Sequence, residues 1–186
     1  DDIITPGESV DQCLIRLEHV FQRLREARLK LKPSKCLFFQ KSAHFLGHIV
    51  SENGIETDPD KVKAVKEWPK PSNSKEVRSF LGLASYYRKF VKGFSEIANP
   101  LHKLCEKHCR FNWTEACQKS FDTLKQGLIS APVLAYPKLG ARFILDTDSS
   151  DFASGAVLSQ VQDDQERVIA YMSKSMNVHE TSYCIS

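Results

Sequence analysis

Residues 73–90, NSKEVRSFLGLASYYRKF, predict an amphipathic helix near the middle of the chain. Asn73, followed three residues later by Glu76, has the form of a capping box, which satisfies free backbone N–H groups at a helix start. Apolar side chains then recur at helical spacing on one face: Val77, Phe80, Leu81, Ala84 and Tyr87. We expect this helix to end near residue 90, with its charged side chains away from the buried face.

Two further helices are predicted on either side of this one. Asp58 and Pro59 form a helix start with proline at the first helical position, and an apolar stripe follows until Pro69 and Pro71 end it: Val62, Val65 and Trp68. A later helix opens at residues 114–115 and ends near residues 131–132, at Ala-Pro. Residues 58–132 therefore predict a small helical bundle.

The amino-terminal part mixes a helix with strands. Ser9 and Gln12 have capping-box spacing, and apolar residues at helical intervals continue until Arg28. Residues 36–39 and 43–50 are apolar and rich in strand formers, and the Glu-Asn-Gly sequence at 52–54 is a turn signal. We expect two strands here, each formed by one of these runs.

The carboxyl-terminal part returns to strand patterns. Residues 142–148, 156–161 and 168–171 are predicted strands, and the Asp-Asp-Gln sequence at 163–165 is a predicted turn. This order indicates the start of a β-meander. A sheet of three strands with one open face is poorly stable alone, so we expect further structure downstream.

Composition excludes several classes of protein. With 41% apolar and 26% charged residues, the 186-residue chain is too apolar to be disordered. It has no apolar run long enough to span a bilayer, and its first residues lack the pattern of a signal peptide. Six cysteines in a chain that can bury a core favour reduced thiols over a disulfide framework. We expect a soluble, intracellular protein.

Charge is distributed unevenly along the chain. Residues 1–60 hold 8 Lys/Arg against 10 Asp/Glu, residues 61–110 hold 12 against 4, and the remainder holds 6 against 9. A basic middle segment beside acidic ends is typical of a surface that binds a polyanion, because Lys and Arg displace counterions from phosphates. The alternative is that these charges are ordinary solvated helix faces.

Two acidic clusters could hold Mg²⁺, and one cysteine–histidine cluster could hold zinc. Asp1 and Asp2 precede a strand-like stretch, and three carboxylates gather after another: Asp146, Asp148 and Asp151. Mg²⁺ uses one or two carboxylates together with substrate phosphates, whereas acidic residues in turns are commonly just solvated. Ligand types for zinc fall within residues 102–117: His102, Cys105, His108, Cys109 and Cys117. Their spacing matches no recognised zinc motif, and free cysteine also packs as a small apolar residue.

The sequence resembles the reverse transcriptase to RNase H region of Ty3/gypsy-type retrotransposon Pol polyproteins along essentially its whole length. Six ordered blocks carry the resemblance: the Asp1–Ile4 segment, LREARLKLKPSKC, HFLGHIVSENGIETDPDKV, EVRSFLGLASYYRKFVKGFSEIANPLHKL, FNWTEACQKSFDTLKQGLISAPVLAYP and FILDTDSSDFASGAVLSQ. They are similar to the end of the polymerase Asp-Asp motif, the following helix and turn, the primer-grip hairpin, two thumb segments and the opening RNase H strands.

The resemblance implies roles for particular residues of the polymerase part. Asp1 and Asp2 would be metal-binding carboxylates that position Mg²⁺ for phosphoryl transfer. Lys35 would lie near the departing pyrophosphate, although a solvated turn lysine is an equal alternative. Three residues would lie in the primer-grip hairpin, which would hold the primer end: Phe45, Leu46 and Gly47. Gly47 would allow close backbone approach, whereas Phe45 and Leu46 also suit any core strand.

The resemblance also assigns roles in the thumb and in the RNase H part. Four cations on the basic segment would bind phosphates of the template–primer duplex: Arg78, Arg88, Lys89 and Lys92. Asp148 would be the first RNase H carboxylate and a Mg²⁺ ligand. The chain departs from the family pattern because an upstream aspartate, the Tyr of the polymerase motif and a downstream Glu are not in it.

The sequence thus predicts an α+β chain in three parts. Residues 1–56 would be the C-terminal edge of a polymerase palm, residues 57–138 a helical thumb bundle, and residues 139–186 the first strands of an RNase H-like α/β domain. The predicted parent is a Mg²⁺-dependent RNA-directed DNA polymerase with RNase H, acting on an RNA/DNA template–primer duplex and dNTPs away from membranes. Two rivals remain at this point: a catalytically dead, domesticated nucleic-acid-binding or interaction module, and a zinc-stabilised binding module.

Overall fold

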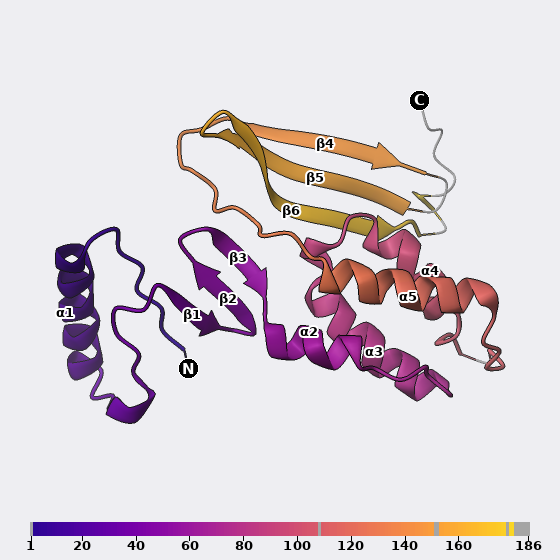
Figure 1. The fold of residues 1–186 in the computed structure, drawn as a ribbon, viewed down its shortest axis with the longest axis horizontal. Helices are drawn as coiled ribbons and strands as arrows, with labels where there is room; N and C mark the ends of the chain where they lie inside the picture. Colours follow the sequence, from indigo (N-terminus) through magenta and orange to yellow (C-terminus); the bar gives the residue numbers. More distant parts are fainter. Residues whose placement is uncertain (1, 108, 151–152, 178, 181–186) are drawn as a thin grey trace. The chain divides into compact units, whose positions relative to one another are not determined.

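A computed structural model describes the chain except for residues 1, 108, 151–152, 178 and 181–186. Contacts divide it into two compact units, residues 1–52 and residues 53–186, and each is described by itself (Figure 1). Helices and antiparallel strands occur in separate stretches of the chain, which confirms the predicted α+β class. Among the residues described, no helix combines the length and apolar character needed to cross a bilayer.

The first unit is built around α1, Val10–Glu26. Its predicted capping residues act as expected, because Ser9 Oγ accepts from the backbone N–H of Gln12 at 3.2 Å and Gln12 Oε1 accepts from the N–H of Glu8 at 2.8 Å. A short 3-10 turn, η1, follows at Pro33–Lys35, and the unit ends with strands β1, Ser42–Phe45, and β2, His48–Ser51. These two strands pair antiparallel.

Two strand predictions in the first unit are wrong. Residues 36–39 form no strand, since Phe39 has a φ of 54° and leaves the extended conformation. Residues 43–50 are not one strand but two, because Leu46 and Gly47, with φ of 45° and 65°, form a two-residue turn between them. Two successive positive φ angles match the tight hairpin turns whose twist suits paired strands. Leu46 and Gly47 are therefore turn residues rather than strand residues.

The second unit contains the predicted helical bundle together with one helix that the pattern did not predict. Strand β3, Gly54–Thr57, leads into α2, Pro59–Lys66; α3, Ser74–Tyr86; the 3-10 turn η2, Arg88–Phe90; α4, Phe94–Lys103; and α5, Glu115–Ile129. The caps of α2, α3 and α5 are the predicted Asp58, Asn73 and Thr114. The unpredicted helix is α4, which contains Pro100 and starts after Gly93.

The helices of the second unit bury one hydrophobic core. Its members include residues of α3, α4, α5 and the turns between them: Val77, Phe80, Tyr87, Phe90, Phe94, Leu101, Phe121, Leu124 and Leu128. Tyr87 is 1% exposed, as helical spacing predicted. A buried Tyr87 leaves its neighbours Arg88 and Lys89 on the outer side of this core.

Three strands form an antiparallel meander at the carboxyl-terminal end of the second unit. They are β4, Phe143–Ser149; β5, Ala153–Gln162; and β6, Gln165–Ser175, in the order β4-β5-β6 (Figure 1). Asp163 and Asp164 make the predicted turn, with φ of 53° and 60°. Both α4 and η2 pack against β6, so the sheet and the helices form one unit.

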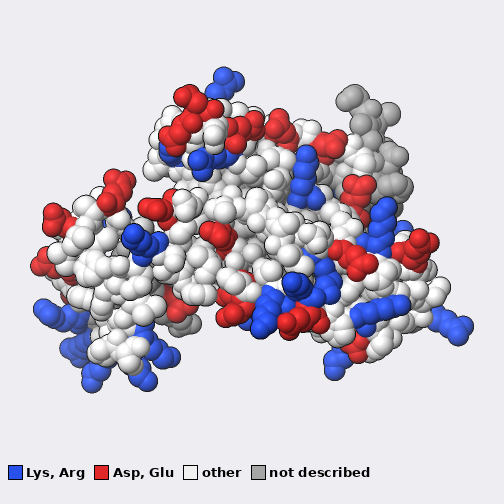
Figure 2. Space-filling model, in the orientation of Figure 1, with Lys and Arg blue, Asp and Glu red and all other residues white. Residues whose placement is uncertain are grey.

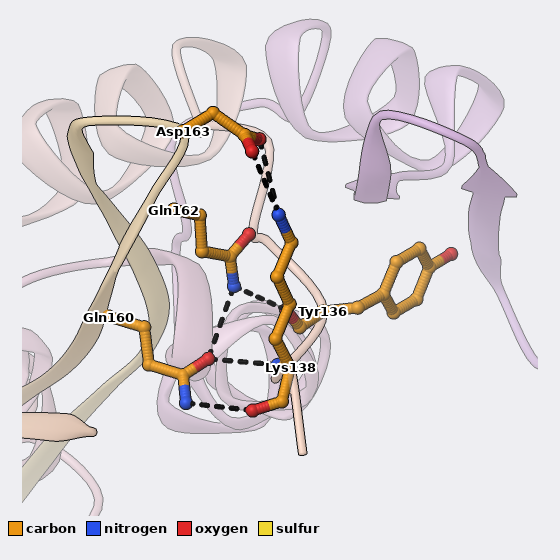
Figure 3. Close-up of polar contacts among 5 residues, drawn as sticks. All are labelled: Tyr136, Lys138, Gln160, Gln162 and Asp163. Carbon is orange, nitrogen blue, oxygen red and sulfur yellow. Dashed lines mark hydrogen bonds and ion pairs between the residues drawn. The ribbon is translucent and has the colours of Figure 1, made fainter. Parts of the chain in front are cut away.

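Buried glutamines hold the segment that joins α5 to β4 (Figure 3). Gln160, which is 0% exposed, accepts from the N–H of Lys138 at 2.9 Å and donates to the carbonyls of Lys138 and Ala141 at 3.2 and 3.1 Å. Gln162 donates to the carbonyl of Tyr136 at 2.7 Å. These bonds satisfy the backbone of an irregular segment, which therefore lies fixed on β5.

The same segment is also attached to β3. Ile55 and Leu134 exchange backbone hydrogen bonds at 2.8 and 2.9 Å. Gly54 has a φ of 135°, and a side-chain carbon there would lie 2.2 Å from the carbonyl oxygen of Leu134. Glycine is therefore required at this position for two independent reasons, its backbone angle and the close approach of the neighbouring chain.

Candidate nucleic-acid interface and carboxylate sites

The polymerase-type residues of the first unit are only partly within the described chain. Asp1 lies outside the described residues. Asp2 is exposed in an irregular segment, and its carboxylate forms no hydrogen bond or ion pair with a described residue. Lys35 ends η1 and is exposed, with its backbone N–H bonded to the carbonyl of Lys32 at 2.9 Å. Both side chains are free to contact a ligand.

The hairpin assigned to the primer end presents one apolar side chain at its tip. Leu46 is 59% exposed, and its backbone carbonyl contacts Nδ1 of His48 at 2.7 Å. Phe45 is half-buried and faces His48 across the first pair of the hairpin. Gly47 adopts the positive φ that the turn requires. Leucine in a left-handed conformation costs about 1–2 kcal/mol, so an exposed Leu46 is an unfavourable choice for the fold alone.

Arg78 stands apart from the other three cations assigned to phosphate binding. It is exposed on α3, and its Nη2 donates to the backbone carbonyl of Cys105 at 2.9 Å. Arg88 follows ten residues later in η2, beyond the end of α3 at Tyr86. The four cations are therefore divided among α3, η2 and the segment that follows η2.

Arg88 is fixed to the sheet. Its Nη2 donates to the backbone carbonyl of Ser173 on β6 and lies 3.5 Å from Oγ of Ser95. Ser173 Oγ in turn accepts from the N–H of Ser95 at 2.9 Å. The guanidinium also lies 5.7 Å from the centre of the Phe94 ring. Arg88 thus ties η2 and the start of α4 to β6, besides any contact it makes with phosphate.

Lys89 and Lys92 differ in their surroundings. The Lys89 ammonium lies 5.3 Å from the centre of the Phe90 ring, and burial lowers the pKa of Lys89. Lys92 is exposed, and its side chain has no hydrogen bond or ion pair within the described part of the chain. Lys92 is therefore the cation of this group that is most available to a phosphate.

The carboxylates of β4 lie on one face of the strand. Asp146 and Asp148 are two residues apart on β4 and so project to the same side of the sheet. Both are exposed, and neither carboxylate is bonded to a described residue. Asp148 faces Gly155 of β5, which has no side chain to crowd it. Asp151 lies outside the described residues.

This donor set is compatible with Mg²⁺. Two free oxygen-donor side chains on one strand face suit a cation that keeps several waters and completes its shell with substrate phosphates. Within the described ranges, no three Asp, Glu, His or Cys residues lie close enough together to hold a metal ion by themselves. A bound phosphate would therefore have to supply further oxygens.

The cysteine–histidine cluster is dispersed rather than gathered. Cys105 Sγ contacts the carbonyl of Ser74 at 3.8 Å, whereas Cys117 is 4% exposed and its Sγ contacts the carbonyl of Pro100 at 3.8 Å. Burial raises the pKa of Cys105, which disfavours the thiolate that zinc requires. His108 lies outside the described residues. The described residues give the zinc hypothesis no support.

Sequence reasoning missed the partners of Arg88. Ser95 and Ser173 are 78 residues apart in the sequence, and each is an unremarkable serine in its own segment. No local pattern signals that they meet. The apolar spacing of Phe94, Ala98 and Leu101 could have revealed the helix that carries Ser95.

Comparisons with known proteins agree with this architecture. The family described as "RNase H-like domain found in reverse transcriptase" matches residues 113–186, so the match begins within the helical part, just before α5. This match defines the class of the carboxyl-terminal part, an RNase H-like domain of the kind found in reverse transcriptases.

Three curated relatives match nearly the whole chain. Two are from Drosophila melanogaster: the retrovirus-related Pol polyprotein from transposon 297, 40% identical over 98% of the chain, and that from transposon 412, 37% identical over 98%. The third is the transposon Tf2-3 polyprotein of Schizosaccharomyces pombe, 35% identical over 100% of the chain. The chain spans 17%, 15% and 14% of their respective lengths.

Solved structures share the fold. The foamy viral protease-reverse transcriptase dRH in complex with double-stranded DNA matches 96% of this chain and 32% of its own, with a TM-score of 0.80 and 24% identity. The foamy viral protease-reverse transcriptase in complex with an RNA/DNA hybrid matches 96% of this chain and 24% of its own, with a TM-score of 0.79 and 24% identity. The chain belongs to the Ty3/gypsy-type retrotransposon Pol polyproteins and covers the end of the reverse transcriptase together with RNase H-like sequence.

Proposed function

We propose that this chain is part of an RNA-directed DNA polymerase with RNase H activity. Residues 1–56 would be the end of the palm, residues 57–138 the thumb, and residues 139–186 the first part of the RNase H-like domain. The observation that carries the proposal is the 35–40% identity to transposon Pol polyproteins along nearly the whole chain. The parent would copy RNA into DNA and hydrolyse the RNA strand of the hybrid.

The carboxylates would act at the two reaction centres. Asp1 and Asp2 would hold Mg²⁺ at the polymerase centre, and Asp148 would hold it at the RNase H centre. Bound Mg²⁺ supplies charge stabilisation and activates the attacking oxygen in phosphoryl transfer. Asp148 is suited to this role because it is exposed at the end of β4 and unbonded to described residues. Lys35 would place a cation beside the leaving pyrophosphate.

The thumb cations would hold the template–primer duplex. Phosphate contacts from a basic helical surface position a duplex without reading its sequence, which is what a polymerase that moves along its template requires. Residues 61–110 carry 12 Lys/Arg against 4 Asp/Glu, and Lys92 has no bonded partner among the described residues. The solved foamy viral relatives were obtained with double-stranded DNA and with an RNA/DNA hybrid, which supports a duplex as the ligand.

The proposal is tested in the full-length parent polyprotein with the variant Asp148→Asn. We expect loss of RNA-strand cleavage with DNA synthesis retained, because the carboxyl oxygens that bind metal are changed in one centre only. Asp163→Asn is the matched control, because Asp163 pairs with Lys138 at 3.1 Å in an exposed turn far along β5 from Asp148. Retained RNA cleavage in Asp148→Asn, or equal loss in the control, would contradict the assignment.

A further inference from the structure

The first unit carries a dense group of cations that its total charge conceals. Six of the eight Lys and Arg residues among residues 1–60 fall between positions 23 and 35, where Glu26 is the single acidic residue. We call this group the α1-end patch: Arg23, Arg25, Arg28, Lys30, Lys32 and Lys35. All six are exposed, and Figure 2 shows Lys and Arg side chains gathered over the end of α1 and the segment after it.

Five of these six cations have no acidic partner among the residues that the structure describes. Arg23 pairs with Glu26 at 3.2 Å, and both side chains remain largely exposed. The other five form no ion pair or side-chain hydrogen bond with any residue that the structure describes. Arg23 and Arg25 lie in the last turn of α1, where the carbonyl end of a helix favours cations by itself. The remaining four lie beyond the helix, so the helix end does not explain them.

Arg28 occupies a backbone position that favours glycine. The N–H of Leu29 bonds to the carbonyl of Leu24 at 2.9 Å, and the N–H of Arg28 bonds to the carbonyl of Arg25 at 3.0 Å. This pair of bonds closes a helix with a left-handed residue, and Arg28 has a φ of 55°. Glycine is the usual residue there because it adopts this angle without strain. The chain thus has an arginine at a position where the backbone conformation favours glycine.

We propose that the α1-end patch binds the phosphodiester backbone of a single nucleic-acid strand. Clustered cations gain affinity for phosphates by releasing condensed counterions. The patch is formed by a helix end, an irregular segment and a 3-10 turn, so its cations do not come from one regular element. A flexible single strand can move its phosphates to meet such charges, whereas a duplex holds them at fixed positions. This site is separate from the thumb cations and goes beyond the proposed duplex binding.

The test uses the full 186-residue chain and a fluorescein-labelled oligothymidylate strand, with affinity measured by anisotropy at several salt concentrations. The patch variant is Arg25→Gln, Arg28→Gln, Lys30→Gln and Lys32→Gln; Lys35 is left unchanged because of its proposed catalytic role. Each contact with a single strand contributes a slope of about −0.7 in log K against log salt, so we expect the slope to flatten by about 3. Circular dichroism should show an unchanged fold.

The matched control removes the same number of exposed cations outside both the patch and the basic segment 61–110: Lys119→Gln, Lys138→Gln, Arg142→Gln and Arg167→Gln. We expect this control to change the slope by less than one contact. An unchanged slope in the patch variant, or an equal loss in the control, would overturn the proposal. A loss seen with duplex probes and not with the single strand would also overturn it. Duplex binding by the thumb is tested with variants of the thumb cations and not of the α1-end patch, so either proposal can fail without the other.

Arg28→Gly separates binding from folding. Glycine suits the left-handed backbone, so the urea midpoint should stay the same or rise while the slope for the single strand flattens by about 0.7. A merely structural residue would not weaken binding while stability is kept. Unchanged affinity of Arg28→Gly at every salt concentration would contradict a contact at this position.

Discussion

Arg88→Ala should destabilise the chain, because Arg88 links the helices to the sheet. The substitution removes the hydrogen bond to the carbonyl of Ser173, the approach to Oγ of Ser95 and the stacking on Phe94. A hydrogen bond from a charged donor contributes about 1.5–3 kcal/mol, and the exposure of this guanidinium places the effect at the lower end. We therefore expect the free energy of unfolding to fall by about 1–2 kcal/mol.

Urea denaturation followed by circular dichroism measures this change. Lys92→Ala is the matched control, because Lys92 is exposed without a bonded partner among the described residues, and its change should stay within about 0.5 kcal/mol. Arg88→Lys keeps the charge but loses the planar donor fork, so it should fall between the two. If Arg88→Ala unfolds at the same urea concentration as the parent chain, the link between η2 and β6 does not stabilise the fold.

Three further predictions concern other parts of the chain. Leu46→Gly should raise the free energy of unfolding of the first unit by up to about 1 kcal/mol, because glycine adopts the positive φ of the hairpin turn without strain. Urea denaturation measures this change, and a loss of stability would show that the leucine side chain is needed there. Gln160→Leu should lower the unfolding free energy by about 2 kcal/mol, since it leaves the N–H of Lys138 and the carbonyl of Ala141 without partners, whereas the carbonyl of Lys138 keeps its bond from the N–H of Ala141; an unaffected midpoint would refute this role. Burial, and next the charge of Arg88, lower the pKa of His102 in the folded chain. As the pH falls, His102 is therefore protonated first in the unfolded chain, and the free energy of unfolding should fall below about pH 6.5. His102→Gln should lessen that fall, and identical pH profiles of unfolding in the parent and the variant would contradict this role of His102.

Local patterns predicted the elements whose stability is local. The helices at α1, α2, α3 and α5 have capping residues and apolar spacing in the sequence itself, and the structure has them there. The turn at Asp163 and Asp164 was also predicted from the sequence, and the structure has it there. The predicted strand over residues 36–39 failed because an apolar run indicates a strand only if a neighbouring strand pairs with it. The helix α4 was missed because Pro100 is unusual within a helix, and tertiary packing of Phe94 and Leu101 outweighs it.

Some features of the candidate site could also be predicted from the local sequence, whereas others could not. The position of Asp148 at the end of a strand followed from the sequence pattern, and the structure has it on β4. The ties of Arg78 to Cys105 and of Arg88 to Ser173 could not be predicted, because each joins segments far apart in the sequence. The total charge of residues 1–60 was a poor guide to their surface, because a net acidic count over this range concealed the basic run at residues 23–35.

The central claim, that the basic helical surface grips a template–primer duplex, is tested by the salt dependence of hybrid binding. The measurement compares the parent chain with the variant Arg78→Ala, Lys89→Ala and Lys92→Ala on an RNA/DNA hybrid, leaving Arg88 in place to preserve the fold. If each cation contacts one phosphate, the slope of log K against log salt should flatten by about 3, taking the value of about −0.9 per contact for B-form DNA. Affinity that ignores salt, or an unchanged slope in the variant, would contradict the account.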